Sequence, residues 1–418
     1  MSSGAVACSS CGRRAAAFQC SGCAEQFYCG RGCQRAHWLS EHHSACGGAR
    51  PIGGPIRFDY GKYVPPRAVL KMADGQTAIV EKILGQGGFG AVVRTAGAEP
   101  EAIKLFDIDD FGGRLGYLNE LFANYAMLGA NKLVCADAAN CAKRSSFVVA
   151  QSAVPGDGGL QSKPLAEVKD PGWATITFPS PKFAAAIDML VFIGQVLAPM
   201  KRANKSNFER TLLSLARDFT ADVALLHENR IAHSDIKPSN VIVEGGALKW
   251  QTALIDFGLS KMFGLSDKIP ELAALLTGGA GLMKGAKAVV DKLVAGKGTP
   301  QAVLFGELSI IVDRVPSGTR THFDPVYRDA GRDKRAVSEK DFYALDTYAV
   351  GVTLFELSTA QAFTPQDTTE SIIAKVRNAP DSTMLASIIR DMTRPDIGNR
   401  RTMRQYSAEI GALVDKLK

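Results

Sequence analysis

The sequence lacks any segment that reads as a secretory leader or a membrane span. Its first residues, MSSGAVA, contain neither the charged region nor the apolar stretch of a signal peptide. The most apolar long run, Phe183–Met200, carries Asp188 and Gln195 and fits a core helix better than a span. We therefore expect a cytoplasmic or nuclear protein that makes no contact with a membrane.

Strong charge bias is also missing. The formal net charge is +7 over 418 residues, and no long basic run occurs. A mildly basic chain without such a run gives no reason to expect nucleic-acid binding. Hydrophobic residues make up 46% of the chain, which is typical of a globular protein, and the length suits about two to three domains.

Cysteine is almost absent outside the N-terminal region, where all but Cys135 and Cys141 of the nine cysteines lie. Clustered cysteines in a reducing compartment indicate metal binding, with a disulfide knot or free thiols as the alternatives. With one histidine they form four closely spaced pairs: Cys8 and Cys11, Cys20 and Cys23, Cys29 and Cys33, His42 and Cys46. Eight such ligands suit two tetrahedral zinc ions, because gaps of two or three residues let both side chains reach one metal.

This segment resembles the MYND zinc finger, through the four ligand pairs, Tyr28-Cys29 and the run CQRAHW at 33–38. The resemblance implies two interleaved ligand sets: Cys8, Cys11, Cys29 and Cys33 for one zinc, and Cys20, Cys23, His42 and Cys46 for the other. His42 keeps the three-residue gap to Cys46, and His43 and His37 are the alternatives. The resemblance also implies that the finger docks a peptide motif of a partner protein; the alternative is a structural appendage.

The most informative stretch is HSDIKPSN at residues 233–240, which DFG follows at 256–258. An acid, a lysine, an amide and a second acid at this spacing form a set suited to phosphoryl transfer. Asp235 would orient a substrate hydroxyl and accept its proton. Asn240 and Asp256 would hold the Mg²⁺ ions that bridge the phosphates of ATP.

A glycine-rich run, LGQGGFGAV at 84–92, lies well upstream. Glycines let backbone amides approach phosphates, where a Cβ would obstruct. A dinucleotide-binding fingerprint would need a helix after the glycines, whereas Ala91–Thr95 is β-like. The expected ATP-binding residues are Leu84, Gly85, Gln86, Gly87, Gly88, Phe89, Gly90, Val92 and, in the strand-like segment Ala102-Ile103-Lys104, Lys104.

The order of these motifs resembles a protein kinase over residues 78–418, and Asp235 followed by Lys237 resembles the serine/threonine class. The resemblance implies an α+β bilobal fold, with a β-rich N-lobe at about 78–155 and a helical C-lobe at about 156–418. The finger would occupy 1–48 and a linker 49–77. Lys104 would contact the α- and β-phosphates with Glu120 as its partner, and Lys237 would contact the transferring phosphate. The implied substrate is a protein hydroxyl.

Two positions depart from the kinase pattern, and the segment after Asp256 is long, with an expected insert at about 261–316. Ser234 replaces an arginine that usually binds an activation-segment phosphate, so we expect little dependence on phosphorylation through this route. Val326 replaces a glutamate that usually pairs with a buried arginine, here Arg400, and Asp324 or Asp329 would substitute. The alternative function is therefore a pseudokinase scaffold that binds partners through the finger. A MYND-bearing methyltransferase finds no supporting motif.

Local patterns predict several further elements. The apolar face of 208–228 predicts a helix, and 146–151 a strand followed by a hinge at Gln151–Gly156. Residues 157–182, rich in Gly, Pro, Ser and Lys, predict a surface loop. Asp346 begins an apolar run; its resemblance to the central kinase helix implies a brace for the catalytic loop, and the plainer interpretation is a helix N-cap.

Overall fold

The computed structural model describes residues 8–9, 18–19, 27–28, 69–71, 77–86, 90–97, 102–107, 116, 119–120, 123, 151–153, 160–161, 173–178, 187–246, 249–263, 316, 318–332, 335–364, 366–378 and 384–417. The chain divides into two compact units, which are described separately. One comprises Met1–Leu118, Ser152–Thr177 and Met283–Lys292, and the other Asn119–Gln151, Phe178–Leu282 and Leu293–Lys418.

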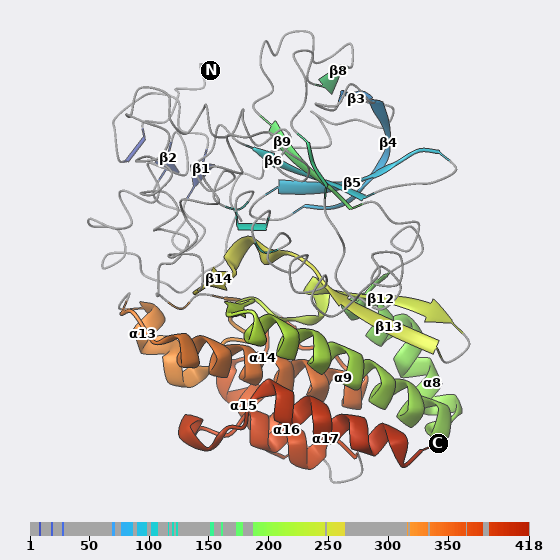
Figure 1. The fold of residues 1–418 in the computed structure, drawn as a ribbon, viewed down its shortest axis with the longest axis vertical. Coiled ribbons are helices and arrows are strands. Elements are labelled where there is room, and N and C mark those ends of the chain that lie inside the picture. Colours follow the sequence, from blue (N-terminus) through green and yellow to red (C-terminus); the bar gives the residue numbers. More distant parts are fainter. Residues whose placement is uncertain are drawn as a thin grey trace, which may run out of the picture. The chain divides into compact units, whose positions relative to one another are not determined.

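The first unit contains a seven-stranded sheet with the order β7-β9-β6-β5-β4-β3-β8 (Figure 1). Its strands are β3 (Val69–Lys71), β4 (Thr77–Gln86), β5 (Gly90–Thr95), β6 (Ala102–Asp107), β7 (Gln151–Ala153), β8 (Leu160–Gln161) and β9 (Trp173–Phe178). Strands β3 to β6 pair antiparallel in sequence order. Alternate residues of β5 and β6, such as Val93, Ile103 and Leu105, are fully buried, as expected for one face of a sheet that covers a core.

Two sequence predictions in this region were wrong. Residues 173–178, expected in a surface loop, form β9, because the run WATITF is rich in the aromatic and β-branched residues that favour strands. Gln151–Ala153, expected to begin a hinge, form β7 at the end of the sheet. Since β9 lies between β7 and β6, the chain leaves this sheet after Phe178 rather than after Gln151. The strand expected at 146–151 lies outside the described residues apart from Gln151.

The expected zinc finger is described at only a few residues. β1 (Phe18–Gln19) and β2 (Phe27–Tyr28) pair antiparallel, with Phe18 opposite Tyr28. Of the predicted zinc ligands, Cys8 is described and is buried. The other seven lie outside the described residues, as do Gly87, Gly88 and Phe89 and nearly all of the predicted insert.

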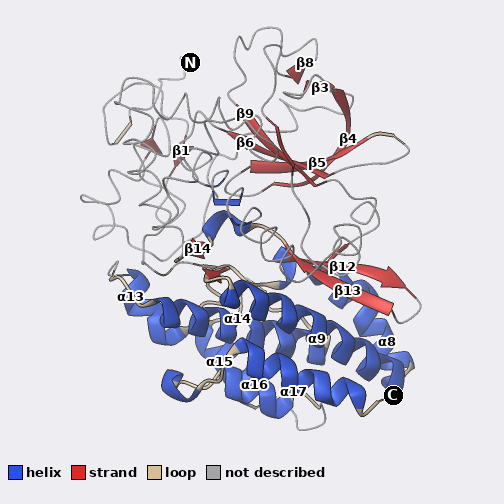
Figure 2. Cartoon of the chain, viewed as in Figure 1, coloured by secondary structure: helices blue, strands red, loops and turns tan. Residues whose placement is uncertain are grey.

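The second unit is mainly helical (Figure 2). Its helices are α7 (Met189–Phe192), a π-helical turn at Ile193–Leu197, α8 (Ala198–Ala203), α9 (Lys205–Glu228), α13 (Arg328–Arg332), α14 (Glu339–Thr359), α15 (Thr369–Arg377), α16 (Ala386–Met392) and α17 (Met403–Asp415). Its short strands are β10 (Ile187–Asp188), β11 (Ile231–Ala232), β12 (Val241–Gly246), β13 (Lys249–Leu254) and β14 (Lys261–Met262). Helix α9 confirms the helix predicted at 208–228.

Helix α14 forms the centre of this unit, beside α9 in Figure 1. Every residue from Leu345 to Ser358 is buried, as expected of a helix that is apolar on all sides. Its N-cap is Ser338, whose hydroxyl accepts from the Asp341 N–H while the Asp341 carboxylate accepts from the Ser338 N–H. The plainer interpretation of Asp346 as an N-cap was therefore wrong, because this residue lies two turns inside the helix.

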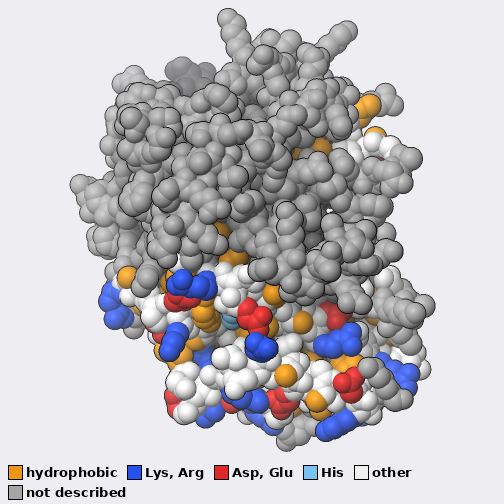
Figure 3. Space-filling view, in the orientation of Figure 1, with side chains coloured by type: hydrophobic (Ala, Val, Ile, Leu, Met, Phe, Trp, Pro, Cys, Tyr) orange, Lys and Arg blue, Asp and Glu red, His pale blue; other side chains and the backbone are white. Residues whose placement is uncertain are grey.

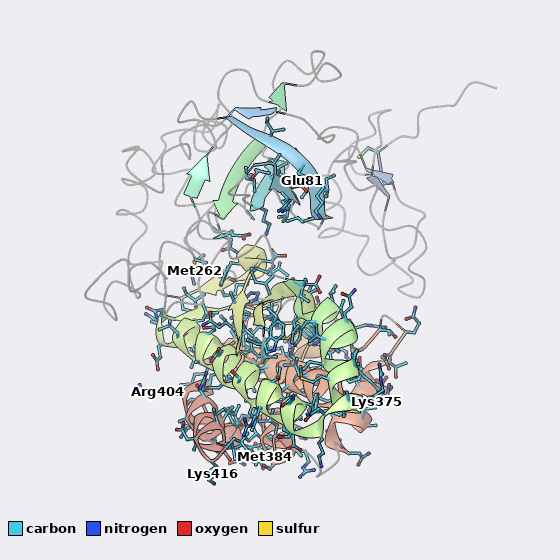
Figure 4. The ribbon with its side chains drawn as sticks, turned by 90° about the vertical axis from the view of Figure 1, so that its right-hand side faces the viewer. Glu81, Met262, Lys375, Met384, Arg404 and Lys416 are labelled. Carbon is cyan, nitrogen blue, oxygen red and sulfur yellow. The ribbon has the colours of Figure 1, made fainter. Side chains whose placement is uncertain are left out.

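The surface of the helical unit carries charges of both signs. On the face shown in Figure 3, Lys and Arg side chains alternate with Asp and Glu. In Figure 4, Lys375 and Arg404 lie at opposite edges of the unit. Among the described residues, none of the helices is long and apolar enough to cross a membrane.

Candidate active site

The loop at 233–240 is held between two pairs of strands. Before it, Ile231 and Ala232 of β11 pair with Met262 and Lys261 of β14. After it, Val241 of β12 lies opposite Leu254 of β13. The backbone N–H of Ile255 donates to the carbonyl of Asn240 at 3.0 Å. Asn240 and Asp256 therefore emerge from the same end of one hairpin, sixteen residues apart in the chain.

Asp346 braces the backbone of this loop, as the kinase resemblance implied. Its carboxylate accepts hydrogen bonds from the backbone N–H groups of His233, at 2.7 Å, and Ser234, at 2.8 Å. His227 Nε2 lies 3.1 Å from the same carboxylate. Asp346 is 1% exposed, so these donors satisfy a charge that burial would otherwise make costly.

Both carboxylate oxygens of Asp235 are engaged. Oδ1 accepts from the backbone N–H of Thr319 at 3.0 Å and from its hydroxyl at 2.6 Å. Oδ2 accepts from Lys237 Nζ at 2.6 Å and from Asn240 Nδ2 at 3.0 Å. Lys237 also donates to the Thr319 hydroxyl at 2.7 Å. The arrangement holds the Asp235 carboxylate in a fixed orientation beside the Thr319 hydroxyl and the Lys237 ammonium group. A general base that acts on a hydroxyl needs such a fixed orientation.

Thr319 is a site residue that the sequence reasoning missed. No role beside Asp235 was predicted for Thr319, although the run GTRTHFDPVY at 318–327 resembles the end of a kinase activation segment. In the structure its backbone and side chain meet the Asp235 carboxylate across 84 residues of sequence. A Cβ at Gly318 would lie 2.7 Å from the backbone oxygen of Ser234, so glycine is required for this close approach.

Asn240 and Asp256 fit the expected role of magnesium ligands. The Asn240 amide nitrogen donates to the Asp235 backbone carbonyl at 2.9 Å as well as to its carboxylate. The amide oxygen is then the end that remains for a cation, and amide and carboxylate oxygens are ligands that Mg²⁺ accepts. Together with the hairpin that places Asp256 beside Asn240, these atoms could hold Mg²⁺.

Asp256 has a strained backbone. It adopts a left-handed conformation with φ 66° and ψ 68°, which is uncommon outside glycine. The next residue, Phe257, is buried and packs on the His233 ring with centroids 5.0 Å apart. Strain of this kind persists where surrounding contacts determine the conformation, and it is frequent at functional sites.

Ser234 carries no charge at the position where an arginine was expected. It also has a left-handed backbone, with φ 66°. Its hydroxyl is buried and finds no hydrogen-bond partner among the described residues. The site therefore holds no cation at this position that could bind a phosphate.

Arg400 pairs with Asp324, one of the two acids proposed to replace the missing glutamate. The side chains are 2% and 0% exposed. Arg400 also donates to the carbonyls of Arg394 and Ala344. Val326 is 46% exposed and takes no part in this ion pair. The end of the activation segment is thus anchored by a relocated ion pair, and the prediction of Asp324 as the substitute is confirmed.

A second buried pair in this segment gave no signal in the sequence. His322 Nε2 lies 2.9 Å from Glu356 Oε2, and both residues are buried. The other Glu356 oxygen accepts from the Phe363 N–H at 2.6 Å. Because His322 and Glu356 are 34 residues apart, only the fold brings them together.

The described members of the expected phosphate-binding set in the first unit lie on its sheet. Lys104 is 7% exposed and lies directly opposite Val92 on the neighbouring strand, so the two share a face. Gly85 lies opposite Val92 on the other side, and Leu84 is exposed. In the second unit Glu120 is helical and 1% exposed. Because both side chains are buried, neither Lys104 nor Glu120 is a solvated surface charge.

Acid is expected to weaken the segment that joins α14 to α15. Hydrogen bonds from Lys375 and from the Thr364 backbone lower the pKa of Asp367 to about 2. A carboxyl group with a depressed pKa stabilises the folded state above its ordinary pKa of about 4, and this contribution is lost as the pH falls toward about 2. Asp367→Asn should therefore lower the thermal midpoint near neutral pH and lower it less at about pH 3. An equal difference at both pH values would contradict this.

Comparison with known proteins finds one family match and several protein kinase relatives. Residues 8–46 match the MYND finger family. A probable myosin light chain kinase of Dictyostelium discoideum is 35% identical over 80 residues, which are 17% of this chain and 23% of that protein. Serine/threonine-protein kinase CAK1 of Saccharomyces cerevisiae is 37% identical over 62 residues, 14% of this chain and 17% of that protein. The chain thus spans less than a quarter of the length of these relatives.

A solved structure matches far more of the chain. The ROP18 kinase domain, solved in complex with AMP-PNP and sucrose, aligns with a TM-score of 0.50 and 18% identity, covering 84% of this chain and 85% of that one. The fold is therefore that of a protein kinase domain, with mixed strands and helices, and it is preceded by a MYND finger. The predicted fold class is confirmed.

Proposed function

We propose that this protein is an active serine/threonine protein kinase that transfers the γ-phosphate of ATP to a protein hydroxyl. The observation that carries the proposal is the hydrogen-bonded set around Asp235, in which Lys237, Asn240 and Thr319 all meet one carboxylate. Asp235 would orient the substrate hydroxyl and accept its proton, while Lys237 would neutralise charge on the transferring phosphate.

The choice of serine or threonine as acceptor is supported by Lys237 and Thr319. Both side chains lie against the Asp235 carboxylate, and Lys237 also donates to the Thr319 hydroxyl. The serine/threonine class is also the one that the Asp235–Lys237 spacing resembles. Assays on matched peptides that differ only in Ser, Thr or Tyr at the acceptor position would separate these classes.

The cofactor would be ATP with Mg²⁺. Asn240 and Asp256 would hold the ions, and Lys104 with the glycine-rich run at 84–92 would bind the phosphates. A bound Mg²⁺ would shield the phosphate charge and order the phosphate groups. AMP-PNP, which the ROP18 kinase domain holds, has the same triphosphate shape and supports this assignment by analogy.

The test is transfer of labelled γ-phosphate from ATP to a panel of protein substrates and to the chain itself. Wild type should transfer phosphate in a Mg²⁺-dependent manner, and Asp256→Ala should abolish transfer while retaining the fold by circular dichroism. If wild type transfers no more than Asp256→Ala on any substrate, the enzyme proposal fails.

The alternative is a pseudokinase scaffold, and the observation that favours it is the uncharged Ser234. The other departure, Val326, no longer supports it, because Asp324 supplies the partner that Arg400 needs. Binding of Mg²⁺-ATP without transfer to any acceptor would favour the scaffold over the enzyme.

For the finger we propose zinc binding and docking of a peptide motif from a partner protein. Zinc content is expected to be about two ions per chain, given eight ligands in tetrahedral sets. Cys8→Ser should lower the zinc content, whereas Cys135→Ser, outside the finger, should not. Metal analysis of the purified variants by mass spectrometry measures this, and equal zinc content in all three chains would refute the ligand assignment.

The proposed location is the cytoplasm or nucleus, and the proposed partners are proteins rather than nucleic acid or membrane. The face of the helical unit in Figure 3 carries charges of both signs, which fits protein partners better than the basic patch of a nucleic-acid interface. Imaging of the tagged full chain would test the location.

A further inference from the structure

Asn119 is a buried polar residue that the proposed mechanism does not use. It precedes Glu120 in a helical segment, and Asn119, Glu120 and Ala123 are 7%, 1% and 0% exposed. Residues at this spacing lie on one face of a helix. An amide on the buried face requires hydrogen-bond partners, because burial without them is costly.

Its partners lie in the segment that follows Asp256. Asn119 Nδ2 donates to the backbone carbonyl of Gly258 at 3.0 Å and to that of Ser260 at 2.9 Å. Carbonyl oxygens only accept, so the nitrogen must face them and the orientation of the amide is determined. The Asn119 Oδ1 atom is buried and has no partner among the described residues. The carbonyls of Gly258 and Ser260 therefore require a side chain at position 119 that donates two hydrogen bonds.

The same segment is tied to the catalytic loop on its other side. The Ser260 hydroxyl donates to the His233 carbonyl at 3.3 Å, and the Phe257 ring packs on the His233 ring. Ser260 N–H donates to the Phe257 carbonyl at 3.0 Å, which closes a tight turn. The turn that follows the strained Asp256 is thus held between the Glu120 helix and the catalytic loop.

We propose that Asn119 is a positioning residue that holds the turn after Asp256 in place relative to the Glu120 helix, and so sets the affinity of Asp256 for Mg²⁺. The inference rests on the proposed function only in giving Asp256 its role as a metal ligand. Without the two hydrogen bonds, the left-handed conformation of Asp256 loses part of the surroundings that determine it. The turn should then open more often and present the carboxylate less often in the orientation that binds metal.

The decisive variant is Asn119→Asp, which keeps the shape of the side chain and replaces its donors by oxygens that face two carbonyls. It should lower the Mg²⁺-dependent gain in ADP affinity by about tenfold or more, corresponding to about 1.4 kcal/mol. Calorimetric titration of ADP with and without Mg²⁺ measures this gain. Hydrogen exchange over 257–263 should also become faster, while exchange over α14 should not change. Asn119→Ala, which removes the donors without adding repulsion, should have a smaller effect of the same kind.

Thr220→Val is the matched control, because it removes a buried hydrogen bond, to the Ala216 carbonyl at 2.8 Å, far along α9 from the site. It should change neither the Mg²⁺-dependent gain nor exchange over 257–263. If Asn119 only fills space, the isosteric Asn119→Asp would be milder than Asn119→Ala, and this order would overturn the proposal. Unchanged exchange over 257–263 in both Asn119 variants would also overturn it.

These readouts separate this inference from the proposed function. A wild-type chain that binds Mg²⁺-ADP and transfers no phosphate would refute the kinase activity and leave the positioning role measurable. If the wild-type chain binds no nucleotide, the titration cannot be made. Hydrogen exchange over 257–263 would then decide whether Asn119 holds the turn in place. Unchanged exchange in an active kinase would refute the positioning role alone.

Discussion

Asp235→Asn is expected to lower the rate of phosphoryl transfer by about 10²- to 10⁴-fold, the usual contribution of a positioned general base. The amide cannot accept the hydroxyl proton. Its nitrogen would also have to face donors, because the carboxylate of Asp235 now accepts four hydrogen bonds from Lys237, Asn240 and Thr319. The measurement is initial-rate transfer of labelled phosphate at saturating Mg²⁺-ATP, with ADP affinity determined in parallel.

The control for this substitution is Glu228→Gln, a change from acid to amide at the end of α9. Glu228 is 46% exposed and pairs with Arg404, which is 82% exposed, at 3.4 Å. Transfer by this variant should equal wild type within about twofold, since exposed pairs contribute about 0–1 kcal/mol. Retention of full transfer by Asp235→Asn would exclude Asp235 as the base.

Asp324→Ala is expected to destabilise the second unit by about 3–5 kcal/mol, the usual cost of leaving a buried charge without its partner. Arg400 would lose its carboxylate while its side chain, now 2% exposed, stays among the carbonyls of Arg394 and Ala344. The change should also release the end of the activation segment and so displace Thr319 from Asp235. Urea unfolding of the variant and of wild type measures the free energy.

Two further variants show whether the loss of the Arg400–Asp324 ion pair causes the destabilisation. Glu409→Ala breaks an exposed pair with Arg401, in which the side chains are 39% and 41% exposed, and should cost about 0–1 kcal/mol. Adding Val326→Glu to Asp324→Ala should recover part of the stability, because it returns a carboxylate to the position where the kinase pattern has one. A loss after Asp324→Ala no larger than that after Glu409→Ala would contradict the prediction.

The sequence predicted correctly those elements of the structure that a few neighbouring residues determine. The spacing of Asp235, Lys237 and Asn240 places all three on one loop, and hydrogen bonds within that loop bring them together. The strand after the glycine-rich run, β5, follows from its β-branched residues. The recurrence of apolar residues on one helical face predicted α9 for the same reason.

The predictions of secondary structure were wrong where contacts with distant segments determine the local structure. Local composition suggested a loop at 157–182, but a sheet with an open position between β7 and β6 takes residues 173–178 as β9. A local interpretation made Asp346 an N-cap, although the apolar helix extends seven residues further back, to Glu339. Strand pairing and helix burial depend on partners that a sequence window does not contain.

The sequence alone determined the class of protein, the residues of the catalytic loop and the departures at Ser234 and Val326. Their consequences were decided by the tertiary structure. Asp324 replaces the missing glutamate at Arg400, Thr319 joins Asp235, and Asn119 meets the turn after Asp256. Residue types and spacing along the chain specify which chemistry is available. Contacts between residues 76, 84 and 139 positions apart exist only after the chain has folded, because burial then selects the partner that satisfies each polar group.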